Sequence, residues 1–324
     1  MTAVPAQPKR IDAGFFSTAS SFTLPLGQHI VPGTLAGYYV DLRVKAPEPV
    51  WPPANVDENH LHVHAVQWGL ACWERWTAGE GDRWLDAALV AGDHLLRMQE
   101  KGGHLDGGLV HRYDYPHTYR LRPPWISALP QGETASLMLR LHSVTGREDF
   151  LDGGHRALRL ISVPTADGGA CAPLGDGWLP EEYPTDPASF VLNGAIFALL
   201  GMYDAALALP DQGHPERFSA AVGTLATNLH RWDTGSWSLY DLYPHPLPNI
   251  ASGAYHALHI TLLTALHKVA PRSEFATTLA RFERYAADPR KAHVATARKV
   301  LFRLVIPRNP ALSRRLPWTA RIHS

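Results

Sequence analysis

The sequence predicts a mainly α fold: an α/α toroid, or partial barrel, of about four helical hairpins preceded by a small N-terminal β-hairpin or arm. Two observations predict this fold. Strongly apolar segments with helical spacing alternate with more amphipathic ones, and the pairs recur roughly every 60 to 70 residues along the 324-residue chain. Because a single helical hairpin cannot bury its own apolar face, repeated hairpins must stack on their neighbours.

The repeat appears when the chain is aligned with itself. "ERWTAGEGDRWLDAALVAGDHLL" begins at Glu74 and "RLHSVTGREDFLDGGHRALRLI" begins at Arg140, and both carry an aromatic-Leu-Asp triplet before an apolar run. Weaker copies begin at Pro215 and Ser273. The copies are expected to be outer helices, and the nearly uniformly apolar segments before them are expected to be inner helices. These inner segments are residues 66–76, 134–143, 194–207 and 255–267.

The chain divides into three stretches. Residues 1–50 lack helical periodicity and include "GYYVDLRVKA", which is typical of a strand, so an arm with short strands is expected there. Residues 51–289 hold the repeat and are expected to form the toroid. Residues 290–324 carry nine Lys or Arg and no Asp or Glu, which leaves 21 basic against 30 acidic residues elsewhere. Such a tail is typical of contact with an anionic surface, and the alternative is an ordinary docked helix.

Composition and motifs exclude several function classes. No segment is long enough to span a membrane and the N-terminus lacks a signal-peptide core, so a cytoplasmic location is expected, peripheral to the inner face of the membrane. Cys72 and Cys171 lack metal-type spacing, and the sequence has no Walker, GxGxxG or GxSxG motif. No cofactor and no nucleic acid partner are expected. A metal site at His60, His62 and His64 is a weaker alternative.

Three long loops, residues 102–131, 166–190 and 234–255, each end just before an inner helix. They therefore gather at one end of the toroid. The middle loop contains "LPEEYPTDP", in which two carboxylates and a phenol sit on a proline-stiffened segment. Ten Trp and eleven Tyr raise the prospect of a carbohydrate site, since aromatic faces stack on sugar rings.

The outer two loops hold further candidates. The last loop contains Tyr240, and Tyr255 lies at the start of a helix, where its side chain can point into the same mouth as Glu182; the alternative is that both are packed aromatics. Arg112 and Arg120 form a basic rim suited to an acidic substrate, because guanidinium groups match carboxylates, and the alternative is solvated loop arginines.

The loops resemble a known family. "PPWISALPQGETASLMLRLHSVTG", "WLPEEYPTDPASFVLNGAIFALLGMYD" and "TGSWSLYDLYPHPLPNIASGAYHALHI" are similar to the C-terminal region of D-glucuronyl C5-epimerases, which convert D-glucuronate to L-iduronate within heparosan or heparan chains. The resemblance covers residues from about 51 to 285, and the large β-rich N-terminal part of animal members is absent or much reduced. It implies an α/α toroid, an isomerase without a cofactor, a glucuronate-containing polysaccharide as substrate and, from the animal members, a homodimer.

The resemblance also assigns roles. The family's catalytic Glu-Tyr pair falls on Glu182 and Tyr183, and its catalytic Tyr falls on Tyr255. Animal members carry an Arg after "YDL" and another in "NLAR", where this chain has Tyr243 and Ser252. The uronate carboxylate is therefore expected to meet other groups, with Arg112, Arg120 and His256 as candidates, and the alternative is that the substrate differs from that of the animal members. The residues expected at the substrate are Arg112, Tyr119, Arg120, Trp125, Gln131, Glu181, Asn193, Tyr240, Tyr243 and His256.

The expected reaction removes the C5 proton, α to the carboxylate, and returns a proton on the opposite face. One acid/base group must flank each face of the ring. Glu182 and Tyr255 belong to different loops and can therefore oppose one another, while Tyr183 assists and Glu181 is a structural partner. Three alternatives stay open: a polysaccharide lyase, a glycoside hydrolase pairing Glu182 with Asp241 or Asp114, and a non-catalytic polysaccharide-binding protein.

Overall fold

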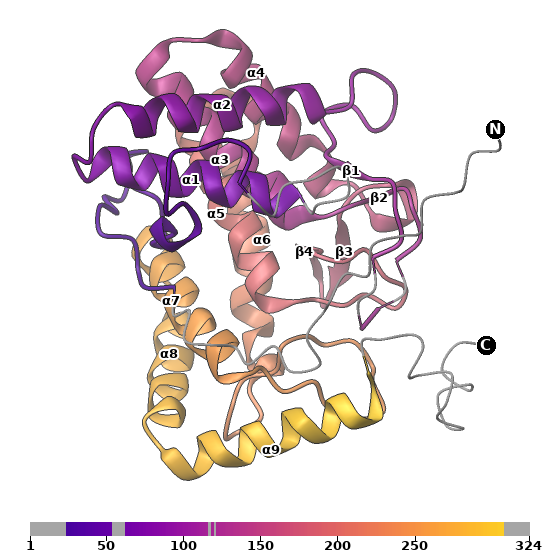
Figure 1. The fold of residues 1–324 in the computed structure, drawn as a ribbon. Coiled ribbons are helices and arrows are strands. Elements are labelled where there is room, and N and C mark those ends of the chain that lie inside the picture. Colours follow the sequence, from indigo (N-terminus) through magenta and orange to yellow (C-terminus); the bar gives the residue numbers. More distant parts are fainter. Residues whose placement is uncertain (1–23, 54–61, 116–117, 120, 308–324) are drawn as a thin grey trace, which may run out of the picture.

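The structure, a computed structural model, describes residues 24–53, 62–115, 118–119 and 121–307, and it is mainly helical as expected (Figure 1). Within these residues eight helices form four successive pairs. The first members are α1 (His62–Thr77), α3 (Ala128–Thr145), α5 (Leu192–Ala208) and α7 (Gly253–Val269). The second members are α2 (Arg83–Met98), α4 (Glu148–Leu158), α6 (His214–Asn228) and α8 (Ser273–Ala286).

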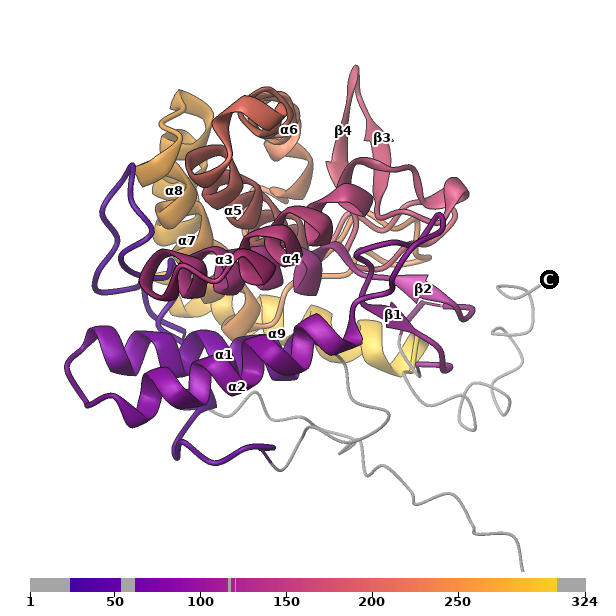
Figure 2. The same ribbon diagram turned by 90° about the horizontal axis from the view of Figure 1, so that it is seen from above.

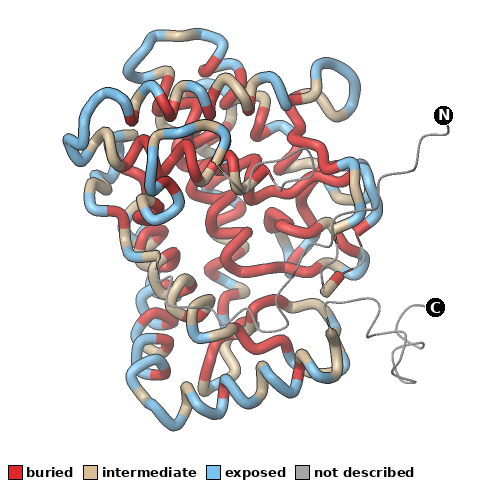
Figure 3. The backbone as a smooth tube through the Cα atoms, in the orientation of Figure 1, coloured by how far each residue is buried: buried red, intermediate tan, exposed pale blue. Residues whose placement is uncertain are grey.

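The first members form the inner layer. Helix α3 packs between α1 and α5, α5 packs on α7, and each second helix lies along its own partner (Figures 1 and 2). Helices α3 and α5 can approach closely because Gly201 has no Cβ. A Cβ at this position would lie 2.1 Å from the carbonyl oxygen of Gly132. Both helices are buried over most of their length, which explains why their sequences are apolar on nearly every side (Figure 3). The closure of these hairpins into a toroid stays a prediction.

The N-terminal hairpin is not confirmed. Residues 1–23 of the predicted arm lie outside the described residues, and the rest shows one isolated antiparallel bridge between Leu26 and Val40. The strand expected over residues 37–46 is replaced by that bridge and by the 3-10 helix η1 (Arg43–Lys45). Pairing does not extend through Tyr38, because its backbone N–H donates to Glu74 of α1 and not to a neighbouring strand.

A buried ion pair holds the same segment in place. Arg140 of α3 and Asp204 of α5 pair with no solvent exposure, and Arg140 also donates to the carbonyl oxygen of Gly37. The hydroxyl of Tyr39 donates to Asp204. Removing one member would leave an unpaired buried charge, which is strongly destabilising. Through its bonds to Gly37 and Tyr39, the pair anchors the arm to the inner helices.

Short strands occupy the long loops. Strands β1 (Val110–His111) and β2 (Trp125–Ile126) pair antiparallel, as do β3 (Cys171–Leu174) and β4 (Gly177–Pro180). The remaining 3-10 helices are η2 (Arg159–Ser162), η3 (Thr165–Asp167), η4 (Pro210–Gln212) and η5 (Leu229–Trp232). The two strand pairs stiffen the loops that precede α3 and α5.

The basic C-terminal segment begins as helix α9 (Pro289–Val305), whose first turn is capped by the Asp288 carboxylate. Its Phe302 is buried, and Lys299 donates to the amide oxygen of Asn249 at 2.7 Å. Helix α9 packs on α8 and α7. None of the described helices is long and apolar enough to cross a bilayer.

Candidate active site

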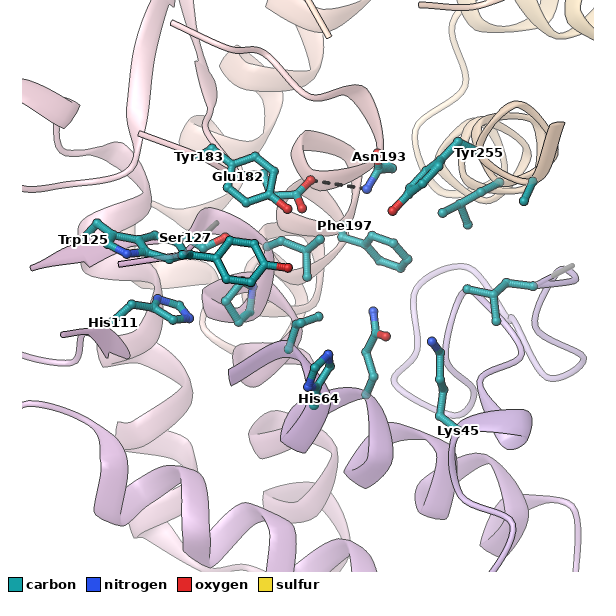
Figure 4. Close-up of a pocket in the computed structure, with 18 residues that line it drawn as sticks. Lys45, His64, His111, Trp125, Ser127, Glu182, Tyr183, Asn193, Phe197 and Tyr255 are labelled. Carbon is teal, nitrogen blue, oxygen red and sulfur yellow. Dashed lines mark hydrogen bonds between the residues drawn. The ribbon is translucent and has the colours of Figure 1, made fainter. Parts of the chain in front are cut away.

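A cavity of about 320 Å³ opens at the N-terminal ends of the inner helices. Residues near the start of α1, α3, α5 and α7 contribute to its walls, together with the segment between β4 and α5. This is the end at which the sequence placed the long loops. The candidate residues that line the cavity are Trp125, Glu182, Tyr183, Asn193 and Tyr255 (Figure 4).

Glu182 lies on the cavity wall with 8% of its surface exposed. The amide nitrogen of Asn193 donates to its Oε2 at 3.3 Å. Gly194 lies directly behind it, because a Cβ there would come within 2.3 Å of Oε2. Burial raises the pKa of Glu182 to about 7, and the charge of Glu181 adds to this, whereas hydrogen bonds from Tyr183 and Asn193 oppose it. A carboxyl with this pKa can accept or release a proton near neutral pH.

Glu181 has the opposite surroundings. Its carboxylate accepts hydrogen bonds from the backbone N–H of Ser189 at 2.9 Å, the Ser189 hydroxyl at 2.7 Å and the backbone N–H of Phe190 at 2.8 Å. Phe190 has a φ of 47°, an unfavourable region for a bulky residue. Glu181 therefore closes the loop onto itself, and it is not among the described residues that line the cavity.

Tyr255 reaches the cavity from the first turn of α7. Ser252 caps this helix and its hydroxyl accepts the backbone N–H of Tyr255 at 3.3 Å. The ring of Tyr240 packs edge-on against Tyr255, with centroids 4.9 Å apart. The hydroxyl of Tyr255 points into the cavity that Glu182 and Tyr183 also face (Figure 4). A carboxyl from the loop between β4 and α5 and a phenol from helix α7 therefore face one cavity.

Tyr183 completes this wall. Its pKa lies well above the ordinary value, first because the phenol is buried and then because Glu182 is adjacent. The phenol is therefore neutral at physiological pH and able to donate a hydrogen bond. Trp125 of β2 stacks on His111 of β1, with ring centroids 3.9 Å apart, and both rings line the cavity.

Several candidates lie elsewhere. Arg112 is exposed and pairs with Glu100 at 2.6 Å. The Gln131 amide is buried and bonded to the backbone of residues 107, 109 and 157. His256 bonds to Ser238 and to the carbonyl oxygen of Phe282, and burial lowers its pKa to about 4. None of these three is among the described cavity-lining residues. Arg120 lies outside the described residues.

Two aromatic candidates form a cluster beside the cavity. The hydroxyl of Tyr119 donates to the carboxylate of Asp241, and its ring packs against Tyr183 and Tyr243 at centroid distances of 5.2 Å and 5.5 Å. Neither Tyr119 nor Tyr243 is among the described lining residues, and the same holds for Tyr240 and Asp241. The cluster supports the back of Tyr183 and contacts the cavity through it.

The sequence interpretation missed the basic side of the cavity. Lys45 of η1 and His64 of α1 both line it, opposite the wall that bears Glu182 (Figure 4). Of the alternative metal site at His60, His62 and His64, His60 lies outside the described residues, and His62 packs against His111 with ring centroids 4.6 Å apart. No group of three potential metal ligands occurs among the described residues. Lys45 lies in the segment read as a strand, where no pattern singled it out.

Comparison with known proteins identifies the family. A D-glucuronyl C5-epimerase of Caenorhabditis elegans is 34% identical over 224 residues, covering 64% of this chain and 36% of that protein, so this chain spans little more than a third of that relative. An uncharacterized protein of Methanocaldococcus jannaschii is 25% identical over 224 residues, covering 66% of this chain and 69% of that protein. The profile described as D-glucuronyl C5-epimerase C-terminus matches residues 99–284, more than half of the chain. The chain therefore belongs to the D-glucuronyl C5-epimerase C-terminal family.

Proposed function

We propose that this protein is a uronate C5-epimerase, an isomerase that converts D-glucuronate to L-iduronate residues within a heparosan-like polymer. One observation carries the proposal: the Glu182 carboxyl, on the loop before α5, and the Tyr255 phenol, on α7, face the same cavity. Family membership and the name of the nematode relative support the reaction class. We further propose that the four helical hairpins form a partial α/α toroid and that the polymer binds at its mouth.

The proposed chemistry uses opposite faces of the sugar ring. Glu182 accepts the C5 proton, and the electron pair left at C5 delocalises into the adjacent carboxylate. The Tyr255 hydroxyl then delivers a proton to the other face. Glu182 releases the C5 proton to solvent, and the Tyr255 phenolate regains a proton from solvent. The pKa of Glu182, raised to about 7 mainly by burial, makes it a stronger base than an exposed carboxylate. The neutral Tyr183 phenol donates to the developing charge.

Exchange in D₂O tests this proposal. Heparosan is incubated with the protein in D₂O, and deuterium at C5 and L-iduronate content are measured by NMR. The expected result is both signals with unchanged chain length. Ultraviolet-absorbing unsaturated ends would indicate a lyase, new reducing ends alone a hydrolase, and binding without any change a non-catalytic module. Tyr255→Phe is expected to abolish the formation of L-iduronate, with Tyr203→Phe, a phenol outside the cavity lining, as its control.

We further propose that α9 rests against an anionic membrane. Val294, Val300, Leu301 and Leu304 are 44% to 60% exposed. Spacings of three, four and seven residues place them on one side of the helix. The segment from 290 to 324 has no acidic residue, so its charge complements anionic lipid.

Vesicle sedimentation tests the α9 proposal. Vesicles that contain phosphatidylserine should sediment the wild-type protein, and Leu301→Asp should reduce the bound fraction. Val90→Asp, at an exposed position of α2, is the matched control. Unchanged binding by Leu301→Asp, or binding to heparosan in place of vesicles, would contradict the proposal.

A further inference from the structure

An enolate-forming reaction next to a carboxylate is favoured by a cation at that carboxylate in addition to hydrogen-bond donors, because the intermediate carries additional negative charge there. The cations expected from the sequence do not supply it within the described residues. Tyr243 and Ser252 stand where relatives have Arg. Arg112 pairs with Glu100 away from the cavity, and His256 has a pKa of about 4 because it is buried. A different group must therefore meet the carboxylate.

Lys45 is the one Lys or Arg among the described residues that line the cavity. No described carboxylate lies within ion-pair distance of its amine. Its neighbours differ in this respect, because Arg43 pairs with Asp41 and Arg75 pairs with Glu80. The Lys45 side chain is exposed to the cavity, so its ammonium group can bind an incoming anion.

The backbone that carries Lys45 is fixed. Arg75 of α1 donates to the carbonyl oxygens of Ala46 at 2.8 Å and Arg43 at 3.2 Å, which clamps η1 against that helix. The backbone N–H of Lys45 donates to the carbonyl oxygen of Leu42 at 2.7 Å. Leu42 and Ala46, on either side of the short helix, have no exposed surface. The side chain therefore projects from a rigid base, as a binding group should.

Two polar residues of α1 accompany Lys45. Gln67 and His64 line the same wall, and the Gln67 amide donates to Glu133 of α3 at 3.0 Å. Glu133 has no exposed surface, and burial raises its pKa to about 8. It is therefore mostly protonated at neutral pH and does not cancel the charge of Lys45. Glu182, on the opposite wall, is the one carboxyl among the described residues that line the cavity (Figure 4).

We infer that Lys45, with His64 and Gln67, forms the subsite that binds the carboxylate of the reacting uronate. The inference rests on the proposed function, in which C5 lies between Glu182 and Tyr255. A carboxylate bound at Lys45 would leave C5 directed toward the space between those two groups (Figure 4). Lys45 lies outside the family match at residues 99–284, so the N-terminal segment completes the site in this chain.

Ligand binding tests the inference without requiring turnover. A heparosan oligosaccharide and its carboxyl-reduced counterpart, in which each glucuronate is replaced by glucose, are titrated into wild-type protein, Lys45→Met, Lys45→Arg and Lys101→Met. Lys101 is exposed and outside the cavity lining, so Lys101→Met makes the same charge change elsewhere. Affinities are measured by calorimetry, and melting temperatures establish that each variant is folded.

We expect wild type and Lys101→Met to prefer the acidic oligosaccharide, Lys45→Met to lose roughly 10- to 100-fold of that preference, and Lys45→Arg to retain most of it. A preference that survives Lys45→Met, or no preference in the wild type, overturns the subsite. Deuterium exchange at C5 is recorded in parallel. A Lys45-dependent preference without exchange supports the subsite and contradicts the epimerase, whereas exchange with an unchanged preference does the reverse.

Discussion

Glu181 and Glu182 are neighbours in the chain, and burial raises the pKa of each to about 7, yet they occupy different environments. Glu181 has no exposed surface and accepts three hydrogen bonds from Ser189 and Phe190. Glu182 faces the cavity, where the side chains of Tyr183 and Asn193 donate to it, and the bond from Asn193 is long at 3.3 Å. Alternation along an extended segment sends the two side chains in opposite directions.

The comparison shows that a shifted pKa alone does not identify a catalytic group. A carboxylate saturated by backbone donors stabilises a loop, and exchanging its proton would cost those bonds. A carboxyl that faces a cavity with few partners can transfer a proton to a substrate at little structural cost. The predictions below separate these two roles.

The largest expected effect is that of Glu182→Gln. The amide still accepts a hydrogen bond from Asn193 but cannot take a proton, so the rate of C5 deuterium exchange should fall by roughly 10³-fold or more. Folding should be unimpaired, because an ionisable group is removed from a site that disfavours its charge. Exchange measured by NMR and unfolding measured by circular dichroism check both parts. An exchange rate within tenfold of wild type would remove Glu182 from the mechanism.

Gly194→Ala should have the next largest effect. The new Cβ would lie 2.3 Å from Oε2 and 2.4 Å from Cβ of Glu182, so the whole side chain must move. A displacement of about 1 Å can cost on the order of 100-fold in rate. Gly223→Ala on α6 is the control, because a Cβ there meets nothing within 4 Å. The control should keep full activity and gain up to about 1 kcal/mol in the free energy of unfolding. Equal exchange rates in the two variants would contradict the prediction.

Glu181→Gln should lower stability more than it lowers activity. The amide group presents N–H donors to the N–H groups of Ser189 and Phe190, so at least one bond is lost. The expected cost is about 1–3 kcal/mol in the free energy of unfolding, measured by urea denaturation at pH 8. Glu48→Gln, at an exposed position, is the control and should change little. Loss of exchange at full stability would instead place Glu181 in the chemistry.

The sequence predicted the helical layers and the acid side of the cavity for physical reasons. Helices α3 and α5 are buried on nearly every side, so their segments are apolar on every side and easily identified. Loops that precede inner helices must gather at one end, so Glu182 and Tyr255 were expected to face one cavity, as they do. Their catalytic roles stay predictions.

The basic side of the cavity was beyond the reach of the sequence patterns. Lys45 reaches it because Arg75 and the Arg140–Asp204 pair dock the N-terminal segment onto the inner helices, a long-range effect without local periodicity. Gln131 and His256 misled for the converse reason. Polar side chains in functional-looking motifs can be fully used by internal hydrogen bonds, and the sequence does not show which bonds those are.

The smallest expected effect is a displacement of the pH profile, and its sign separates the two neighbours once more. If Glu182 is the base, kcat/KM rises with pH as the carboxyl ionises, near pH 7. Asn193→Ala removes a donor that stabilises the ionised form, so the rising limb should move to higher pH. Glu181→Gln removes a negative charge that disfavours ionisation, so the limb should move to lower pH. Each displacement should be below about one pH unit, since each is a minor contribution beside burial. Initial rates of C5 exchange between pH 5 and 9 measure both, and displacements in the same direction would show that the limb reports a group other than Glu182.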